Sequence, residues 1–321
     1  MTTPSHRRTR RDALAALLAA TIVPATIVHA RDRPYHVGAF TSSGSFEWLP
    51  KALAELGYIE GKNLHVEKRA APLSLDMADL RRAAAELVRS EVDVLVSGGT
   101  QRIAALAEAT STIPIVSGPL PDPVGVGFAR SLRHPGRNIT GLSAGLPEQS
   151  EIMVGLLRTV RPRLRRIVAT VRHVSLAAQF ARSMQVVAEA AGIRLEFATA
   201  ENMGDVERII TPLDPETVAV YKMNAAPELP AAKVAAVAIR RRIALMGEAR
   251  EGALMQYGME HADPERRVAA IIDRILRGES PAEIPFELPD RTTFIINRAT
   301  AKAIGVNLSP EILLRATEVI G

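Results

Sequence analysis

The sequence predicts an α/β protein with two lobes, each built on a parallel β-sheet with helices on both faces. The chain has 321 residues, which is more than one typical domain. Short apolar runs alternate with stretches of helical periodicity along most of its length. This alternation occurs in two successive series, the second starting after Pro147. Two Rossmann-like lobes are therefore expected.

The first series contains five predicted strands. The run Val92–Val96 consists mainly of valine and leucine, which is typical of a strand covered on both faces. Each predicted helix has apolar residues at helical spacing, and Gly57 ends the first of them. The strands are expected at 35–40, 64–68, 92–96, 113–116 and 139–142, and the helices at 48–57, 76–89, 101–109 and 126–132.

The second series repeats this pattern with four strands and four helices. The strands are expected at 166–171, 193–198, 218–223 and 243–247, and the helices at 148–160, 176–191, 206–210 and 233–241. Because strands and helices alternate without a long linker or an internal sequence repeat, short connections are expected between the lobes.

Residues 1–30 are predicted to be an export signal peptide. A basic cluster that includes Arg10-Arg11 precedes an apolar stretch that ends at Val28-His29-Ala30. The cluster is similar to a twin-arginine signal, and general secretory export remains the alternative. A membrane anchor is also possible, although Pro24 interrupts the apolar stretch. Since a lipid anchor requires a cysteine, we expect a soluble, unanchored protein in the periplasm.

Composition argues against several other functions. Most of the net charge of +5 lies in residues 1–30, so the remainder is close to neutral and a nucleic-acid partner is not expected. The chain has no cysteine, which excludes disulfides and thiolate chemistry. The histidines lack metal-ligand spacing, and no nucleophile elbow, phosphate-binding loop or dinucleotide fingerprint occurs. We therefore expect no enzyme activity, metal or cofactor.

The candidate binding residues follow predicted strands, because parallel sheets bind ligands at the carboxyl ends of their strands. In Ser97-Gly98-Gly99-Thr100-Gln101 a glycine turn leads into a helix whose free N–H groups suit a ligand carboxylate. An ordinary strand-to-helix turn is the alternative. In Pro121-Asp122-Pro123-Val124-Gly125 the aspartate suits a ligand ammonium group, or caps the helix predicted at 126–132. Ser42-Ser43-Gly44 offers hydroxyl groups, or a local cap.

Several motifs resemble the ABC-transporter substrate-binding protein family often described as tryptophan/tyrosine-type, which has a type I periplasmic-binding fold. The resemblance extends from about Pro34 to the C-terminus, and the order and spacing of the motifs make it specific. The motifs are Leu56–Asn63, Val92–Thr100, Thr112–Val116, Asp122–Gly125, Pro135–Gly141, Ala253–Gly258 and Asn297–Gly305.

The resemblance implies a hinge in which the chain crosses between the lobes three times, near Gly141, near Tyr257-Gly258 and near 285–289. It places 33–141 and about 258–284 in the N-terminal lobe, and 142–257 and about 285–321 in the C-terminal lobe. It also implies ligand contacts at Gly99, Thr100, Asp122 and Pro123. The partners would be a membrane permease and its ATPase.

The second lobe departs from the family pattern. Arg172-His173-Val174-Ser175 replaces the frequent Asn-Pro turn, and Asn224 follows a strand that contains Lys222. We expect His173, Val174, Ser175 and Asn224 to contact the ligand, with Tyr257 contributing a ring. These departures indicate that the ligand is not necessarily an aromatic amino acid.

Together these features predict a monomeric periplasmic binding protein of an ABC importer. It would capture a small amino-acid-like or carboxylate solute by closure of the lobes. The alternatives are a ligand-sensing subunit of a membrane receptor, a periplasmic enzyme of unknown reaction, and a binding protein with two crossings.

Overall fold

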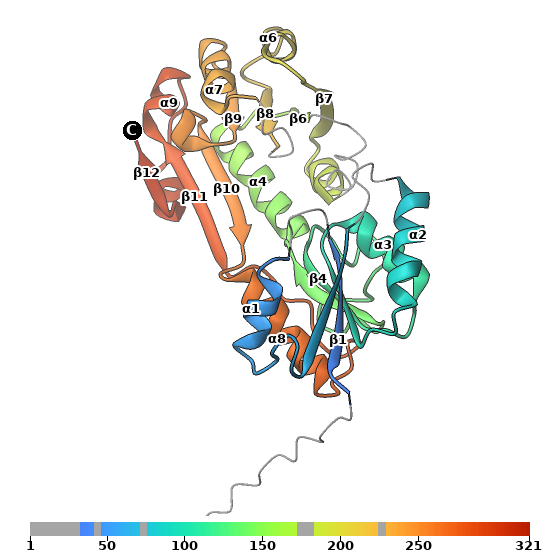
Figure 1. Ribbon diagram of the computed structural model, residues 1–321. Helices are drawn as coiled ribbons and strands as arrows, with labels where there is room; N and C mark the ends of the chain where they lie inside the picture. The colour runs from blue at the N-terminus through green and yellow to red at the C-terminus, as the bar shows by residue number, and fades with distance from the viewer. Residues whose placement is uncertain (1–32, 42–45, 71–75, 172–182, 224–228) are drawn as a thin grey trace, which may run out of the picture. The chain divides into compact units, whose positions relative to one another are not determined.

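Two β-sheets organise the described residues of the computed structural model, which are 33–41, 46–70, 76–171, 183–223 and 229–321 (Figure 1). The first sheet has the order β2-β1-β3-β4-β5, and all its pairs are parallel. Its strands are β1 (Tyr35–Thr41), β2 (Leu64–Ala70), β3 (Val94–Ser97), β4 (Ile115–Leu120) and β5 (Ile139–Ser143).

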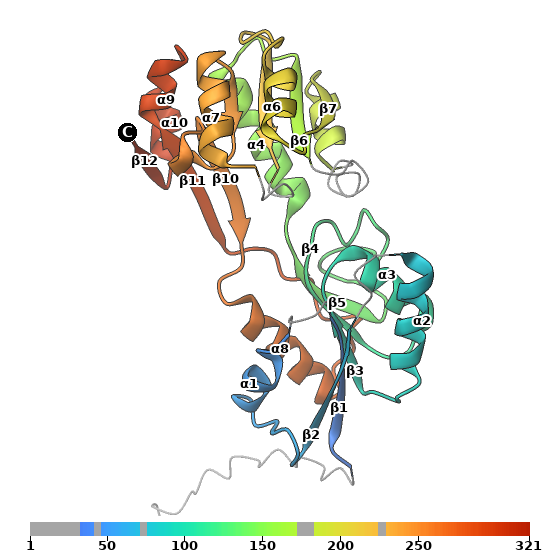
Figure 2. The same cartoon turned by 45° about the horizontal axis from the view of Figure 1, so that its top comes forward.

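Helices cover both faces of the first sheet (Figure 2). Along β3, Val94 and Val96 face one apolar cluster and Leu95 faces the other, because successive side chains alternate across a strand. The helices α1 (Leu49–Ala54) and α8 (Pro264–Leu276) belong to the first cluster. The helices α2 (Met77–Val88) and α3 (Thr100–Ala109) belong to the second.

The second sheet has the order β12-β11-β10-β9-β8-β6-β7. The pair β10–β11 is antiparallel and the other pairs are parallel. Its strands are β6 (Arg166–Val171), β7 (Arg194–Thr199), β8 (Val218–Lys222), β9 (Ala244–Met246), β10 (Met255–Glu260), β11 (Arg291–Asn297) and β12 (Glu318–Ile320).

The second sheet is also covered on both faces. One apolar cluster includes α4 (Leu146–Val160), helical residues 183–190, α9 (Arg298–Ala303) and α10 (Pro310–Arg315). The cluster on the other face includes α6 (Met203–Ile210) and α7 (Ala231–Arg240). The predicted fold class, two α/β lobes with parallel sheets, is confirmed.

Three segments connect the two sheets within the described part of the chain, between β5 and α4, between β10 and α8, and between α8 and β11. Hydrogen bonds tie these segments together. The Ser143 N–H donates to the Glu287 carbonyl at 2.8 Å, and the Glu287 N–H donates to the Gly141 carbonyl at 3.0 Å. The buried His261 ring lies 2.7 Å, through Nε2, from the Ser143 carbonyl oxygen. The first and third segments therefore run together as a short parallel bridge.

A buried tyrosine fastens α8 to the first lobe. The Tyr58 hydroxyl donates to Asp273 Oδ1 at 2.8 Å across 215 positions of sequence, and its ring packs edge-on against Tyr35. Burial, together with the hydrogen bond to Asp273 and its charge, raises the pKa of Tyr58 to about 12 from an ordinary value of 10.0. This contact contributes stability below pH 10 and loses it as the pH rises toward 12.

Tyr58→Phe is expected to destabilise the protein by about 1–2 kcal/mol at pH 7, because it removes a hydrogen bond to a charged acceptor. Urea unfolding at pH 7 and at pH 10–12 measures this loss. The difference in unfolding free energy between wild type and variant should shrink between pH 10 and pH 12, because ionisation of Tyr58 in the wild type removes the same hydrogen bond. A constant difference across that range would contradict this account.

One predicted helix is wrong. Residues 126–132 form turns instead of a helix. The N–H groups of Phe128 and Ala129 both donate to the Pro123 carbonyl, and that of Arg130 donates to Pro135. These bonds replace the i to i−4 bonds that a helix requires.

The predicted export signal, residues 1–30, lies outside the described residues. Among the described helices, none combines the length and the apolar composition that a bilayer crossing requires.

Candidate functional site

The turn after β3 holds its backbone in a conformation that requires glycine. Gly99 has φ +84° and is the N-cap residue of α3, and no side chain caps that helix end. A Cβ at Gly99 would lie 2.9 Å from Arg102 Nη2. Ser97, which ends the strand, is fully buried and donates its hydroxyl hydrogen to the Phe40 carbonyl at 2.6 Å. The result is a rigid turn with backbone N–H groups at the carboxyl edge of the sheet.

Arg102 folds back over this turn. Its Nε donates to the Gly98 carbonyl at 2.6 Å, and burial lowers the pKa of its guanidinium below the ordinary value. Within the described residues no carboxylate lies within ion-pair distance of this side chain. A partly buried cation without an acidic partner therefore lies beside a helix N-terminus, and both favour an anion.

The turn after β4 holds Asp122. Its Oδ1 accepts a hydrogen bond from the Gly125 N–H at 2.7 Å, and its Oδ2 accepts one from the Ser183 hydroxyl at 3.2 Å. Because residues 126–132 are not helical, Asp122 caps a turn and not a helix. Pro123 accepts the backbone bonds of the same turn, and Val124 is exposed.

Several predicted contacts lie outside the described residues, namely Ser42, Ser43, Gly44, His173, Val174, Ser175 and Asn224. The strands that precede them, β1, β6 and β8, are described. The start of α3 holds Gly99, Thr100 and Gln101 together. The turn after β4 holds Asp122, Pro123 and Val124, and β4 is separated from β1 by one strand, β3.

The second lobe has a cavity of about 640 Å³ beside the carboxyl ends of β8 and β9 and along β10. Tyr257 lines it, and its ring packs against Phe294 with 6.1 Å between centroids. Burial raises the pKa of Tyr257. The lining residues are Gln149, Tyr221, Lys222, Leu229, Pro230, Ala231, Met246, Gly247, Glu248, Gln256, Tyr257, Gly258, Met259, Glu260 and Thr293.

A buried ion pair forms part of this cavity wall. The Lys222 side chain is 3% exposed, and its Nζ donates to Glu248 Oε1 at 2.6 Å. Glu248 follows β9, so the pair joins the ends of two adjacent strands. Burial and the charge of Glu248 raise the pKa of Tyr221 to about 12. The sequence drew attention to Lys222, but Glu248 carries no local signal that marks it as its partner.

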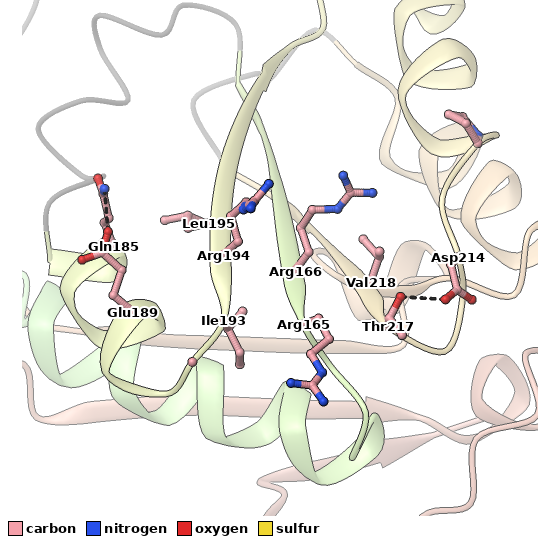
Figure 3. A pocket seen from close by; sticks show the side chains of 12 residues that line it. Arg165, Arg166, Gln185, Glu189, Ile193, Arg194, Leu195, Asp214, Thr217 and Val218 are labelled. Carbon is pink, nitrogen blue, oxygen red and sulfur yellow. Dashed lines mark hydrogen bonds between the residues drawn. The ribbon is translucent and has the colours of Figure 1, made fainter.

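A second hollow, of about 810 Å³, lies at the opposite edge of the same sheet (Figure 3). Arg166, Arg194 and Val218, which begin β6, β7 and β8, line it. Arg166 and Arg194 both pair with Glu196, at 3.3 and 3.7 Å. Because this is the amino edge of the strands, it is not the position at which parallel sheets bind ligands.

The described residues contain no group of three histidine, aspartate or glutamate side chains placed to hold a metal ion. The polar groups of both carboxyl edges are instead suited to hydrogen bonds and ion pairs with a small solute. Two α/β lobes joined by three segments, with such groups at the strand ends, form the architecture of the type I periplasmic-binding fold.

Comparison with known proteins identifies the family. A family model described as ABC transporter substrate binding protein matches residues 45–320. The chain therefore belongs to the ABC transporter substrate-binding protein family, as its motifs indicated, and its role is to bind a solute for an ABC importer. This family is a substrate-binding class and not an enzyme class.

Individual proteins are similar to this chain in sequence or in fold. A tyrosine-binding protein of Clostridioides difficile strain R20291 is 26% identical over 270 residues, covering 79% of this chain and 74% of the relative. A conserved domain protein from Vibrio cholerae O1 biovar El Tor is 25% identical, with a TM-score of 0.65 over 89% of this chain and 100% of that one. A Streptococcus pneumoniae ABC domain in complex with L-Trp is 20% identical, with a TM-score of 0.63 over 89% of this chain and 100% of that one.

Proposed function

We propose that this protein is the periplasmic receptor of an ABC importer for an amino-acid-like solute, which it binds between its lobes by hinge closure. The observation that carries the proposal is the electropositive turn after β3, where Arg102 and the start of α3 favour a carboxylate. The names of two relatives, which refer to tyrosine and L-Trp, support the same class of ligand.

The proposal includes the partners and the location of the protein. A membrane permease would recognise the ligand-bound form, and a cytoplasmic ATPase would drive transport. The sequence of residues 1–30 and the absence of cysteine support export into the periplasm without a lipid anchor. Cell fractionation tests this, because the mature protein should appear in the periplasmic fraction and be shorter than its precursor.

The ligand contacts would come from both lobes. In the first lobe we propose the turns at Gly99–Gln101 and Asp122–Val124, together with Ser42, Ser43 and Gly44. In the second lobe we propose His173, Val174, Ser175, Asn224 and Tyr257. A ligand stabilises the closed form only through contacts that are made in that form, so both groups are required.

A thermal-shift screen of amino acids, small carboxylates and nucleosides tests the ligand class. A solute that binds only the native state raises the melting temperature by mass action, by an amount that corresponds to about 2.7 kcal/mol at 100 times its Kd. We expect the shift with one or more amino acids. A shift with nucleosides alone would contradict the proposal.

Arg102→Met is expected to weaken binding of a carboxylate-bearing amino acid on the order of 10- to 100-fold, because it removes a charge-assisted contact. Calorimetric titration with L-tyrosine and with L-tyrosinamide, which lacks the carboxylate, measures this effect. Wild type should prefer tyrosine, and the variant should bind the two probes about equally.

Arg82→Met is the matched control, because Arg82 is exposed on α2 of the same lobe and pairs with Asp79. This variant should keep the preference of wild type. If Arg102→Met bound tyrosine as tightly as the control, the assignment of the carboxylate to this turn would be wrong.

A further inference from the structure

We propose that Glu248 is the residue that selects solutes with a primary ammonium group, and that Lys222 holds its carboxylate in place. This inference rests on the proposed function, since it assigns the second charged end of the same solute. Neither residue is among the ligand contacts proposed above. Both side chains line the cavity of the second lobe.

The two oxygens of the Glu248 carboxylate have different surroundings. Oε1 accepts the hydrogen bond from Lys222 Nζ at 2.6 Å. Oε2 is shielded from solvent and accepts no hydrogen bond within the described residues. A shielded carboxylate oxygen without a donor is costly, so a ligand that supplies one gains binding energy.

The side chain as a whole remains within reach of a ligand. Glu248 is 34% exposed, in contrast to Lys222 at 3%. Lys222 is therefore the buried support that fixes the carboxylate from behind, and Glu248 is the group at the cavity surface.

The charges of the cavity wall favour a cation. Lys222 is its basic lining residue, while Glu248 and Glu260 are both acidic. Glu260 lies 3.8 Å from Arg291 and is 62% exposed, so solvent screens it. An ammonium group forms a stronger bond to a carboxylate than a hydroxyl or amide donor does, which is why we assign an amine to this position.

The test compares L-tyrosine with 3-(4-hydroxyphenyl)propionate, which lacks the amine, and L-tryptophan with indole-3-propionate. Wild type is expected to bind each amino acid on the order of 100-fold more tightly than its deaminated analogue. In Glu248→Gln this preference should fall below about tenfold. Glu207→Gln is the matched control, because Glu207 lies outside the cavity, is exposed on α6 of the same lobe and pairs with Arg240. It should keep the wild-type preference.

A second variant addresses folding, because Glu248→Gln leaves the Lys222 ammonium without a counter-ion. The double variant Lys222→Met with Glu248→Gln removes both charges, and thermal unfolding confirms that it is folded. It should show the same loss of preference as the single variant.

The outcomes separate this inference from the proposed function. Equal binding of amine and deaminated analogue by wild type, while Arg102→Met still weakens both, overturns the role of Glu248 and leaves the amino-acid receptor in place. Unchanged preference in Glu248→Gln also overturns it. Failure of wild type to bind any of the four probes overturns the proposed ligand class and this inference with it.

Discussion

Gly141→Ala is expected to destabilise the protein by about 3 kcal/mol or more, the largest effect expected of any single substitution considered for this chain. Gly141 has φ +144° and lies buried in β5, beside Ser117 of β4. A Cβ there would lie 2.2 Å from the Ser117 carbonyl oxygen and 2.6 Å from its nitrogen. Because those atoms belong to the backbone of a paired strand, they have little freedom to move.

Urea unfolding measures this loss, and Gly258→Ala is the matched control. Gly258 also lies in a strand next to a connecting segment, but its φ is ordinary and a Cβ there meets no atom within 4 Å. The control should change stability by less than about 1 kcal/mol. Similar stabilities for the two variants would show that the close approach of β4 and β5 is relaxed in solution.

Glu248→Ala is expected to cost roughly 3 kcal/mol of stability, the second of the large effects. The reason is the burial of Lys222, which would keep its ammonium group away from solvent with no counter-ion. Glu248 is partly exposed, so water can approach Lys222 in the variant and limit the loss of stability. We therefore expect a loss at the lower end of the range found when one partner of a buried ion pair is removed.

A double-mutant cycle with Lys222→Met identifies the cause. The double variant should recover most of the lost stability, because the apolar methionine, which has a similar length, replaces the Lys222 side chain and its unpaired ammonium group. Chemical unfolding of the wild type, both single variants and the double variant gives the coupling energy. If the double variant were no more stable than Glu248→Ala alone, the pair would not account for the loss.

The strands up to β9 could be predicted because each has a local signal, whereas β10, β11 and β12 of the second sheet were not predicted as strands. The run at 166–171 is apolar and β-branched and forms β6 over those same residues. The helix predicted at 126–132 failed for a physical reason that is not local. The carbonyl groups of Pro123 and Pro135 accept the N–H groups of Phe128, Ala129 and Arg130, and a sequence pattern does not show that competition.

The site could be predicted only in part. Gly99 stands out because a turn between a strand and a helix requires glycine, and its φ of +84° agrees with that expectation. Arg102 lies inside a helix, where a charged residue is normally taken for part of a solvated face. The position of its guanidinium over Gly98 depends on a side-chain conformation that spacing does not specify.

The pairing of Lys222 with Glu248 depends on strand order. The two residues are 26 positions apart, and they meet because β8 and β9 are neighbours in the second sheet. A helix, α7, lies between them in the sequence. Nothing in the intervening sequence specifies this contact, so only the assembled sheet reveals it.

A crystal structure of the protein with a bound amino acid tests the central claim most directly. The account predicts the ligand carboxylate within hydrogen-bond distance of the Gly98–Arg102 turn, and its ammonium group within that distance of Glu248. A ligand bound in the arginine-lined hollow at the amino ends of β6 and β7, with both carboxyl edges empty, would contradict it.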